Sequence, residues 1–324
     1  MLKARDIGRV FERVNRKVRI LAHSRSQHRL ARLKADQKAR FEGLRGRFSE
    51  KYGKLKGYGI EEFTTPAWRE WNTKVEAMFV PVPPFGFLRE RIISYTMFVS
   101  AGGKWLNRQV AFLEGEVPGP KLRRALMEDY VGCPLLMNAS YLTSHNSIHH
   151  LYHLARFAHV TGQDLDEMMT VVEWGGGYGN LAKIFMRLGN GDGTYVIIDT
   201  PLFSCIQWLY LATTWGEERV HLLGDPEDKI QAGKINLMPV CFVRRHELSA
   251  DLFISTWALS ESSRLAQDYV VGRKWFNARR LLLAYEDAYP DFPDADRVGQ
   301  LARAAGATIE EIDFLPGHRY YAFR

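Results

Sequence analysis

The chain has 324 residues, of which 46% are hydrophobic and 12% aromatic, and its net charge is +7. This composition supplies a large core in one or two globular domains and excludes a disordered or fibrous protein. We expect a cytoplasmic protein, because its three cysteines form no CxxC pair and no segment has the length or pattern of a membrane span or a secretory signal.

Residues 1–57 form a basic arm with a net charge of +13, whereas residues 58–324 carry −6. Apolar residues recur at helical spacing in two stretches: Ile7, Phe11, Val14, Val18 and Leu21, then Leu30, Leu33, Phe41, Leu44 and Phe48. We predict two amphipathic helices that pack on the protein itself, pair with a second copy, or lie on the anionic inner face of a membrane. Nucleic acid is the less favoured partner, because no recognition motif accompanies the charge.

Residues 58–162 are predicted to form a mainly helical cap that faces the substrate, with proline-rich interruptions. Near its end, Ser144 suits a helix N-cap, and His145, His149 and His153 recur every four residues on one polar face. We expect this face to line a cleft in which Asn146 binds a cofactor, with a hydrogen-bonded contact between domains as the alternative for the histidines. A metal site is disfavoured, because no HExxH pattern or adjacent carboxylate accompanies the histidines.

Residues 163–324 alternate strand and helix signals, which predicts an α/β domain with a mainly parallel sheet and crossover helices. The predicted strands are "MTVVEW", "TYVIID", "RVHLL", "ADLFIST", "ARRLLLAYED", "TIEEIDFL" and "RYYAFR", and the last two form a C-terminal β-hairpin. The segment "KINLMPVCFVRRHEL", residues 234–248, fits either a further strand or a loop over the sheet.

The stretch "EWGGGYGN" follows the first of these strands directly. Glycines at a strand-to-helix turn admit positive φ and let a ligand approach the free N–H groups of the main chain. A nicotinamide fingerprint would place a third small residue at position 180, which is Asn180. The chain instead matches (E/D)xGxGxG through Glu173, Gly175, Gly177 and Gly179, and an acid, Asp199, ends the next strand.

This motif resembles the first motif of class I S-adenosylmethionine-dependent methyltransferases. The resemblance implies a Rossmann-like seven-stranded sheet whose last strand is antiparallel, with S-adenosylmethionine as the cofactor. It also implies that Glu173 faces the methionyl ammonium, that the glycines admit the carboxylate and sugar of the cofactor, and that Asp199 accepts both ribose hydroxyls. Trp174 departs from the small or aliphatic residue that is more usual there, and we expect it to pack under the loop.

Four stretches, "TSHNSIHHLYHLARF", "EWGGGYGNLAKIF", "YVIIDTPLF" and "DLFISTWALSE", resemble in this order a family of sugar O-methyltransferases encoded in bacterial surface-polysaccharide clusters. This narrower resemblance implies that the acceptor is a sugar hydroxyl of a polysaccharide or its precursor. Two other functions stay open: a nucleic-acid or small-molecule methyltransferase, and a non-catalytic protein of the same fold. Against a nucleic-acid methyltransferase, this chain lacks the (N/D/S)PP(Y/F) motif of amino-methylating enzymes after its fourth predicted strand.

Methyl transfer to a hydroxyl requires an acceptor oxygen held in line with the methyl group, and a general base that takes the hydroxyl proton adds to the rate. The candidates are His145 and His149 on the polar helix face, and Glu261 after the fourth predicted strand, where a first-turn helix acid is the competing interpretation. Asp287 is a weaker candidate. The acids of "YEDAYPDFPDAD" leave a divalent metal as an open alternative, although no metal ligand is assigned.

Overall fold

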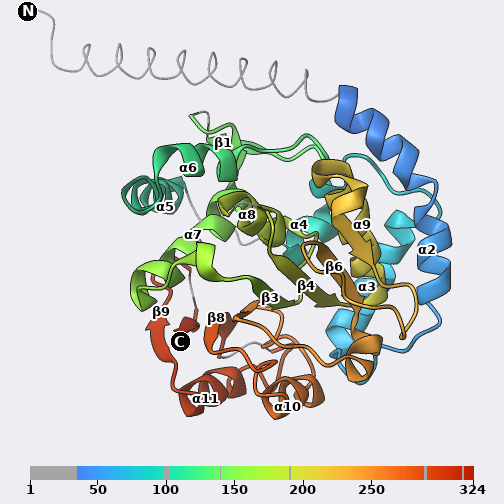
Figure 1. Ribbon diagram of the computed structural model, residues 1–324. Helices are drawn as coiled ribbons and strands as arrows, with labels where there is room; N and C mark the ends of the chain where they lie inside the picture. The colour runs from blue at the N-terminus through green and yellow to red at the C-terminus, as the bar shows by residue number, and fades with distance from the viewer. Residues whose placement is uncertain (1–34, 98–102, 139, 190, 288–289, 316) are drawn as a thin grey trace, which may run out of the picture.

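The computed structural model describes residues 35–97, 103–138, 140–189, 191–287, 290–315 and 317–324 (Figure 1). The first part is helical, and a small antiparallel pair, β1 (Leu136–Asn138) and β2 (Thr143–Ser144), precedes its last helix. Its helices are one over 35–45, followed by α2 (Phe48–Leu55), α3 (Pro66–Phe79), α4 (Arg91–Met97), α5 (Gly103–Glu116), α6 (Gly119–Leu126) and α7 (His145–Thr161). The β1–β2 pair was not predicted from the sequence.

The second part alternates strands and helices around one sheet. Its strands are β3 (Thr170–Trp174), β4 (Thr194–Asp199), β5 (Val220–Leu222), β6 (Ile235–Pro239), β7 (Leu252–Thr256), β8 (Arg280–Glu286), β9 (Thr308–Glu311) and β10 (Arg319–Phe323). Its α-helices are α8 (Asn180–Leu188), α9 (Pro201–Trp215), α10 (Arg264–Gly272) and α11 (Arg297–Ala304). Figure 1 shows α7, α8 and α9 above the sheet and α10 and α11 below it.

The strand order is β5-β6-β4-β3-β7-β8-β10-β9. The strands from β5 to β8 are parallel, and β10 pairs antiparallel with both β8 and β9. This confirms the predicted Rossmann-like α/β class with a C-terminal β-hairpin. The order reverses direction between β4 and β7, on either side of β3, and parallel sheets bind ligands at the carboxyl ends of the strands at such a point.

The sheet has eight strands in place of the predicted seven. Residues 234–248 form β6 followed by a 3₁₀ turn, η4 (Val240–Arg245), and β6 lies between β4 and the predicted third strand, β5. All five residues of β6 are buried. The strand alternative for this segment is therefore confirmed. The amide of Asn236 is satisfied by the carbonyls of Gln231 and Lys234, and Pro239 stands at the last position, where one lost ladder bond costs little.

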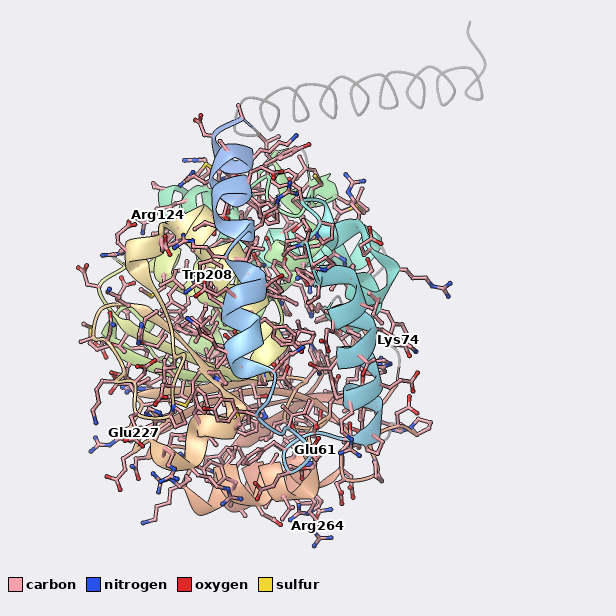
Figure 2. All side chains as sticks on the ribbon, turned by 90° about the vertical axis from the view of Figure 1, so that its right-hand side faces the viewer. Glu61, Lys74, Arg124, Trp208, Glu227 and Arg264 are labelled. Atoms are coloured by element: carbon pink, nitrogen blue, oxygen red, sulfur yellow. The ribbon has the colours of Figure 1, made fainter. Side chains whose placement is uncertain are left out.

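The described half of the basic arm packs on the protein itself. Phe41, Phe48 and Leu55 are fully buried in the same hydrophobic core as the sheet. Helix α2 lies against α9, where the Arg47 and Lys51 side chains lie 5.5 and 4.6 Å from the centre of the Trp208 ring (Figure 2). Residues 1–34, which carry the first predicted stripe, lie outside the described residues.

Helix α7 begins at its predicted N-cap, Ser144. The Ser144 hydroxyl accepts a hydrogen bond from the Ser147 N–H at 3.2 Å, and Gly162 closes the helix with a φ of +67°. Among the described helices, none is long and apolar enough to cross a membrane.

Candidate active site

A cavity of about 450 Å³ opens at the carboxyl ends of β3, β4 and β7, where the strand order reverses. One wall is the glycine loop between β3 and α8 with the acids Glu173 and Asp199, and we call it the motif wall. A second group of lining side chains, which we call the aromatic wall, comes from distant segments: Trp68, Trp71, Tyr95, Phe203, Phe292 and Leu315. Ligand sites of this size and mixed lining are typical of enzymes.

The glycine loop needs its glycines for conformation and for space. Gly175 has a φ of +77°, and a Cβ atom there would lie 2.0 Å from the Cβ of Ala258 in the loop after β7. Gly179, the N-cap of α8, has a φ of +91° and abuts Leu211 of α9. Bare backbone therefore lets the β7 loop and α9 approach the turn, while Gly175, Gly176 and Gly177 line the cavity and Gly179 does not.

Asp199 ties the glycine loop to the end of β4. Its Oδ2 accepts hydrogen bonds from the Gly176 N–H at 3.0 Å and the Gln207 side-chain amide at 2.8 Å, and its Oδ1 accepts from the Thr200 N–H at 2.8 Å. Burial raises the pKa of this carboxyl to about 7, although the hydrogen bonds act in the opposite direction. Asp199 therefore lines the cavity as a strongly positioned carboxyl with remaining capacity to accept.

Glu173 lies beneath the same loop and is 1% exposed. The Tyr195 hydroxyl donates to its Oε2 at 3.0 Å. Burial, reinforced by the negative charge of Asp199, raises the pKa of Glu173 to about 8. Burial thus destabilises the ionised forms of both carboxyls at this wall. A positively charged ligand beside them would favour their ionisation.

The Trp174 side chain packs against Phe63 and the segment after β7, and its position under the glycine loop stays a prediction. Its indole N–H donates to the Ser262 hydroxyl at 3.0 Å, and its carbonyl accepts from the Ser255 hydroxyl at 3.0 Å. The side chain is buried at 4% exposure. These bonds join the ends of β3 and β7 and thereby hold the floor of the cavity together.

The histidine face of α7 is turned differently from the prediction. Neither His145 nor His149 lines the cavity. His149 is buried against α5, where its Nδ1 lies 3.0 Å from the Gln109 amide nitrogen, and His153 pairs with the Tyr321 hydroxyl at 2.8 Å. The proposed general-base role for His145 and His149 therefore lacks the required position, because this stripe faces the protein interior.

Asn146 and His150, also four residues apart, are the α7 residues that reach the cavity. The Asn146 amide donates to the hydroxyl of Tyr178 in the glycine loop at 3.0 Å. The His150 Nδ1 lies 3.1 Å from the amide nitrogen of Asn180, the first residue of α8. Sequence reasoning found Asn146 but missed His150, although the same four-residue spacing fits both stripes.

Glu261 lines the cavity on the side of the aromatic wall. The Trp68 indole N–H donates to its Oε2 at 2.8 Å. Burial, helped by the nearby charge of Glu286, raises the pKa of Glu261 to about 7, whereas the Trp68 bond acts in the opposite direction. Of the predicted catalytic residues, Glu261 alone combines cavity access with a pKa near neutrality.

The aromatic wall is built by edge-to-face ring contacts between segments far apart in the chain. Trp71 meets Trp68 at 5.1 Å, Tyr95 at 5.5 Å and Phe292 at 5.9 Å between ring centres. Beside it, Arg319 of β10 holds Glu286 of β8 through an Nε to Oε1 bond of 2.9 Å, and both line the cavity.

Asp287 does not line the cavity. Positions 288 and 289 of the acidic stretch "YEDAYPDFPDAD" lie outside the described residues. Over the part of the chain that the structure describes, no group of three or more His, Cys, Asp or Glu side chains is arranged to hold a metal ion.

No family model matches the chain, and no curated protein matches it. Among solved structures, the mitomycin 7-O-methyltransferase MmcR is 14% identical, with 68% of this chain and 66% of that chain covered and a TM-score of 0.37. Magnesium protoporphyrin IX methyltransferase from Synechocystis PCC 6803 with bound S-adenosylmethionine is 13% identical over 70% and 100%, with a TM-score of 0.37. Human N-acetylserotonin methyltransferase is 14% identical over 77% and 73%, with a TM-score of 0.33. Likenesses this remote carry no argument about activity or substrate.

Proposed function

We propose that the protein is an S-adenosylmethionine-dependent O-methyltransferase that acts on a sugar hydroxyl. The observation that carries this proposal is the pair of carboxyls, buried Glu173 and half-buried Asp199, that flanks a glycine loop in the (E/D)xGxGxG pattern. S-adenosylmethionine, when bound, supplies an activated methyl group and a positive charge. That charge suits the two carboxyls, whose raised pKa values reflect burial without a strong cationic partner among the described residues.

The residues of the motif wall fit this cofactor. Gly175, Gly176 and Gly177 present bare main chain to the cavity, and Asp199 has acceptor capacity for the ribose hydroxyls. Glu173, at the end of the central strand, would face the ammonium group. The chain itself thus supplies binding and orientation, which is most of what transfer from an activated donor requires.

The aromatic wall favours a sugar as the acceptor. A sugar ring has apolar C–H faces that pack on aromatic rings, and a rim of hydroxyls that bind to charged side chains. Trp71 and Phe292 stand on this wall close to the Glu286–Arg319 pair, so both kinds of group meet in one cavity. Glu261 would take the proton of the attacking hydroxyl on its carboxylate.

A direct test combines cofactor binding with methyl transfer. Calorimetry should show that the wild-type protein binds S-adenosylmethionine. The affinity of Asp199→Ala should be weaker by about tenfold or more, because the ribose hydroxyls would lose a charged acceptor. Glu261→Gln is the matched control, since it changes the other wall and should keep cofactor affinity. Transfer of labelled methyl groups to candidate sugars then tests the acceptor class. Absence of binding by the wild-type protein would refute the cofactor, and transfer only to nucleic acid would refute the sugar.

A further inference from the structure

His150 has one ring nitrogen available to the cavity. Its Nδ1 is engaged by Asn180, while the Nε2 atoms of His145, His149 and His153 are buried without a described partner. The His150 Nε2 is not in that buried condition, and the residue lines the cavity beside the glycine loop. Whether Nε2 carries a proton therefore decides whether His150 donates a hydrogen bond to a ligand or accepts a proton from it.

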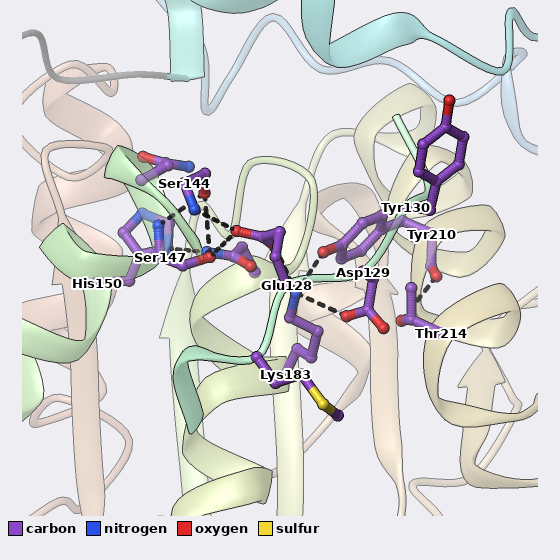
Figure 3. Close-up of polar contacts among 12 residues, drawn as sticks. Glu128, Asp129, Tyr130, Ser144, Ser147, His150, Lys183, Tyr210 and Thr214 are labelled. Carbon is purple, nitrogen blue, oxygen red and sulfur yellow. Dashed lines mark hydrogen bonds and ion pairs between the residues drawn. The ribbon is translucent and has the colours of Figure 1, made fainter. Parts of the chain in front are cut away.

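A chain of hydrogen bonds begins at the buried Glu128 carboxylate (Figure 3). Burial acts to raise the pKa of Glu128, but the charge of Lys183 and the bonds from Ser144 and Ser147 outweigh it, so the pKa lies below its ordinary value. The Lys183 ammonium lies 3.3 Å from Oε1, and the Ser144 N–H donates to Oε2 at 2.9 Å. An ionised carboxylate only accepts, which sets the direction of every bond that follows.

The Ser147 hydroxyl is the next member. It lies 2.7 Å from Glu128 Oε2, so its single proton points to the carboxylate. The Ser147 oxygen must then accept from Asn180, whose side-chain nitrogen lies 3.3 Å away. This bond fixes the orientation of the Asn180 amide, because the reversed amide would face the Ser147 oxygen with its own oxygen. The second N–H of the same amide nitrogen is left to donate to His150 Nδ1 at 3.1 Å.

We propose that the chain Glu128–Ser147–Asn180 locks His150 as the Nε2–H tautomer, so that His150 donates a hydrogen bond to an oxygen atom of the bound ligand and is not the general base. The inference about the tautomer stands on these contacts, and the identity of the ligand rests on the proposed function. The oxygen belongs either to the carboxylate of the cofactor or to the sugar acceptor. His150 is a binding residue on either alternative.

Burial and the charge of Lys183 lower the pKa of His150 to about 3, which is consistent with a neutral ring. The α8 N-terminus begins beside it at Asn180, and the partial positive charge of a helix N-terminus favours the same oxygen-rich ligand groups as an N–H donor. Through this network, the buried Glu128–Lys183 ion pair determines which ring nitrogen of His150 carries the proton at the cavity surface.

Nitrogen-15 NMR of histidine-labelled full-length protein tests the tautomer without any ligand. The His150 signal, assigned by its loss in His150→Gln, should show a protonated Nε2 and an unprotonated Nδ1. In Ser147→Ala the Asn180 amide is released, and the Nδ1–H form should become populated. A wild-type ring protonated at Nδ1 would overturn the proposal, whether or not the protein transfers methyl groups.

Ligand measurements use a matched pair of variants. The Gln side chain of His150→Gln keeps an N–H donor near the Nε2 position but cannot act as a base, whereas His150→Leu removes the donor. We expect the ligand affinity of His150→Gln to stay within about threefold of the wild-type value. The ligand affinity of His150→Leu should be about tenfold weaker. Loss in S-adenosylmethionine affinity assigns the oxygen to the cofactor, and loss only in acceptor KM assigns it to the sugar. Equal, large losses of kcat in both variants would overturn the donor role.

Asn180→Asp distinguishes a hydrogen-bond donor from a general base at His150, because the two roles predict opposite changes in this variant. A carboxylate at this position would accept from Nδ1–H and leave Nε2 as a lone pair facing the cavity. The donor role predicts weaker ligand binding in this variant, with the thermal unfolding midpoint as a check on folding. Improved turnover would show that the lone pair is the productive form and would refute the proposal. If the variant does not fold, the His150 pair still decides.

Discussion

The two walls of the cavity differ in how the chain builds them. The motif wall comes from one short stretch, residues 173–199, and is held by hydrogen bonds between neighbouring strand ends, such as those from Gly176 and Thr200 to Asp199. The aromatic wall draws on α3, α4 and α9 and on residues near 292 and 315, and it is held by ring contacts. Under the proposed function, the wall assigned to the cofactor is therefore encoded in one stretch of the chain, whereas the wall assigned to the acceptor is assembled from distant segments.

The largest expected effect comes from Glu261→Gln, which acts on the acceptor side. A general base contributes about 10² to 10⁴ in rate, so kcat should fall by that order while cofactor affinity is retained. Because the raised pKa of Glu261 is about 7, wild-type kcat/KM should fall as the pH drops below 7, where the base becomes protonated. The variant should lack this step. An unchanged pH profile in Glu261→Gln would assign the base to another group.

A smaller effect is expected from Gly175→Ala on the motif wall. The new Cβ would meet Ala258 at 2.0 Å in a left-handed backbone conformation, so the turn must shift, at a cost of roughly 1 to 3 kcal/mol. Cofactor affinity should weaken by about 10- to 100-fold in calorimetry. Gly162→Ala is the matched control, because Gly162 has a similar φ of +67° but no atom within 4 Å of the added Cβ. Equal affinity losses in both variants would contradict a specific role of the tight turn.

These local features explain how much of the molecule the sequence predicts. The alternation of strands and helices, the C-terminal β-hairpin and the positions of Glu173 and Asp199 all follow from short patterns. The sequence leaves β6 undecided between a strand and a loop, because Asn236 and Pro239 break its apolar run, although contacts within the fold compensate for both. The aromatic wall has no local pattern to find, since ring contacts such as that between Trp71 and Phe292 join segments more than two hundred positions apart.

The histidine stripe failed for a different physical reason. Helical periodicity identifies a face reliably when one side of a helix is apolar and the other meets water. Helix α7 is buried on most of its circumference, including Ile148, His149 and His153, so polar residues on it do not mark a solvent or cleft side. The sequence predicts Asn146 at the cleft, and the position of the glycine loop adds His150 from the same stripe.

A more modest change tests the buried charge of the motif wall. The pKa of Glu173 is raised to about 8 from an ordinary value near 4.5, so the folded state binds a proton more tightly than the unfolded state. Its contribution to stability is complete below pH 4.5 and is lost as the pH rises through 8. The buried histidines of α7, whose pKa values are lowered, act in the opposite direction below about pH 6.5, so the effect of Glu173 is the difference between the wild-type and Glu173→Gln unfolding free energies without cofactor. This difference should fall by on the order of 1 kcal/mol or more as the pH rises from 5 to 9.

Glu173→Gln should flatten that pH dependence, because the amide imitates the protonated carboxyl at every pH. Asp199 and Glu261, whose pKa values are also raised to about 7, should leave a residual fall in stability that ends as the pH passes 7. The exposed Glu227, changed to Gln, serves as the control and should reproduce the wild-type curve. A Glu173→Gln protein with the full wild-type slope would show that Glu173 is already ionised in the folded protein.

The smallest effect is expected from removing residues 1–34, which leaves both walls and the packed part of the arm. Turnover on a soluble acceptor and the unfolding midpoint should stay within about twofold and a few degrees of wild type. A longer deletion, of residues 1–57, removes the buried side chains of Phe41, Phe48 and Leu55 and should destabilise the protein by several kcal/mol, since each large buried side chain contributes about 1.5 to 3 kcal/mol.

The short deletion thus isolates the proposed contact of the basic arm with an anionic membrane or a second copy. Loss of vesicle co-sedimentation would support the membrane, and a halved molecular mass would support self-association. Loss of turnover with cofactor binding intact would instead place residues 1–34 among the parts that form the aromatic wall.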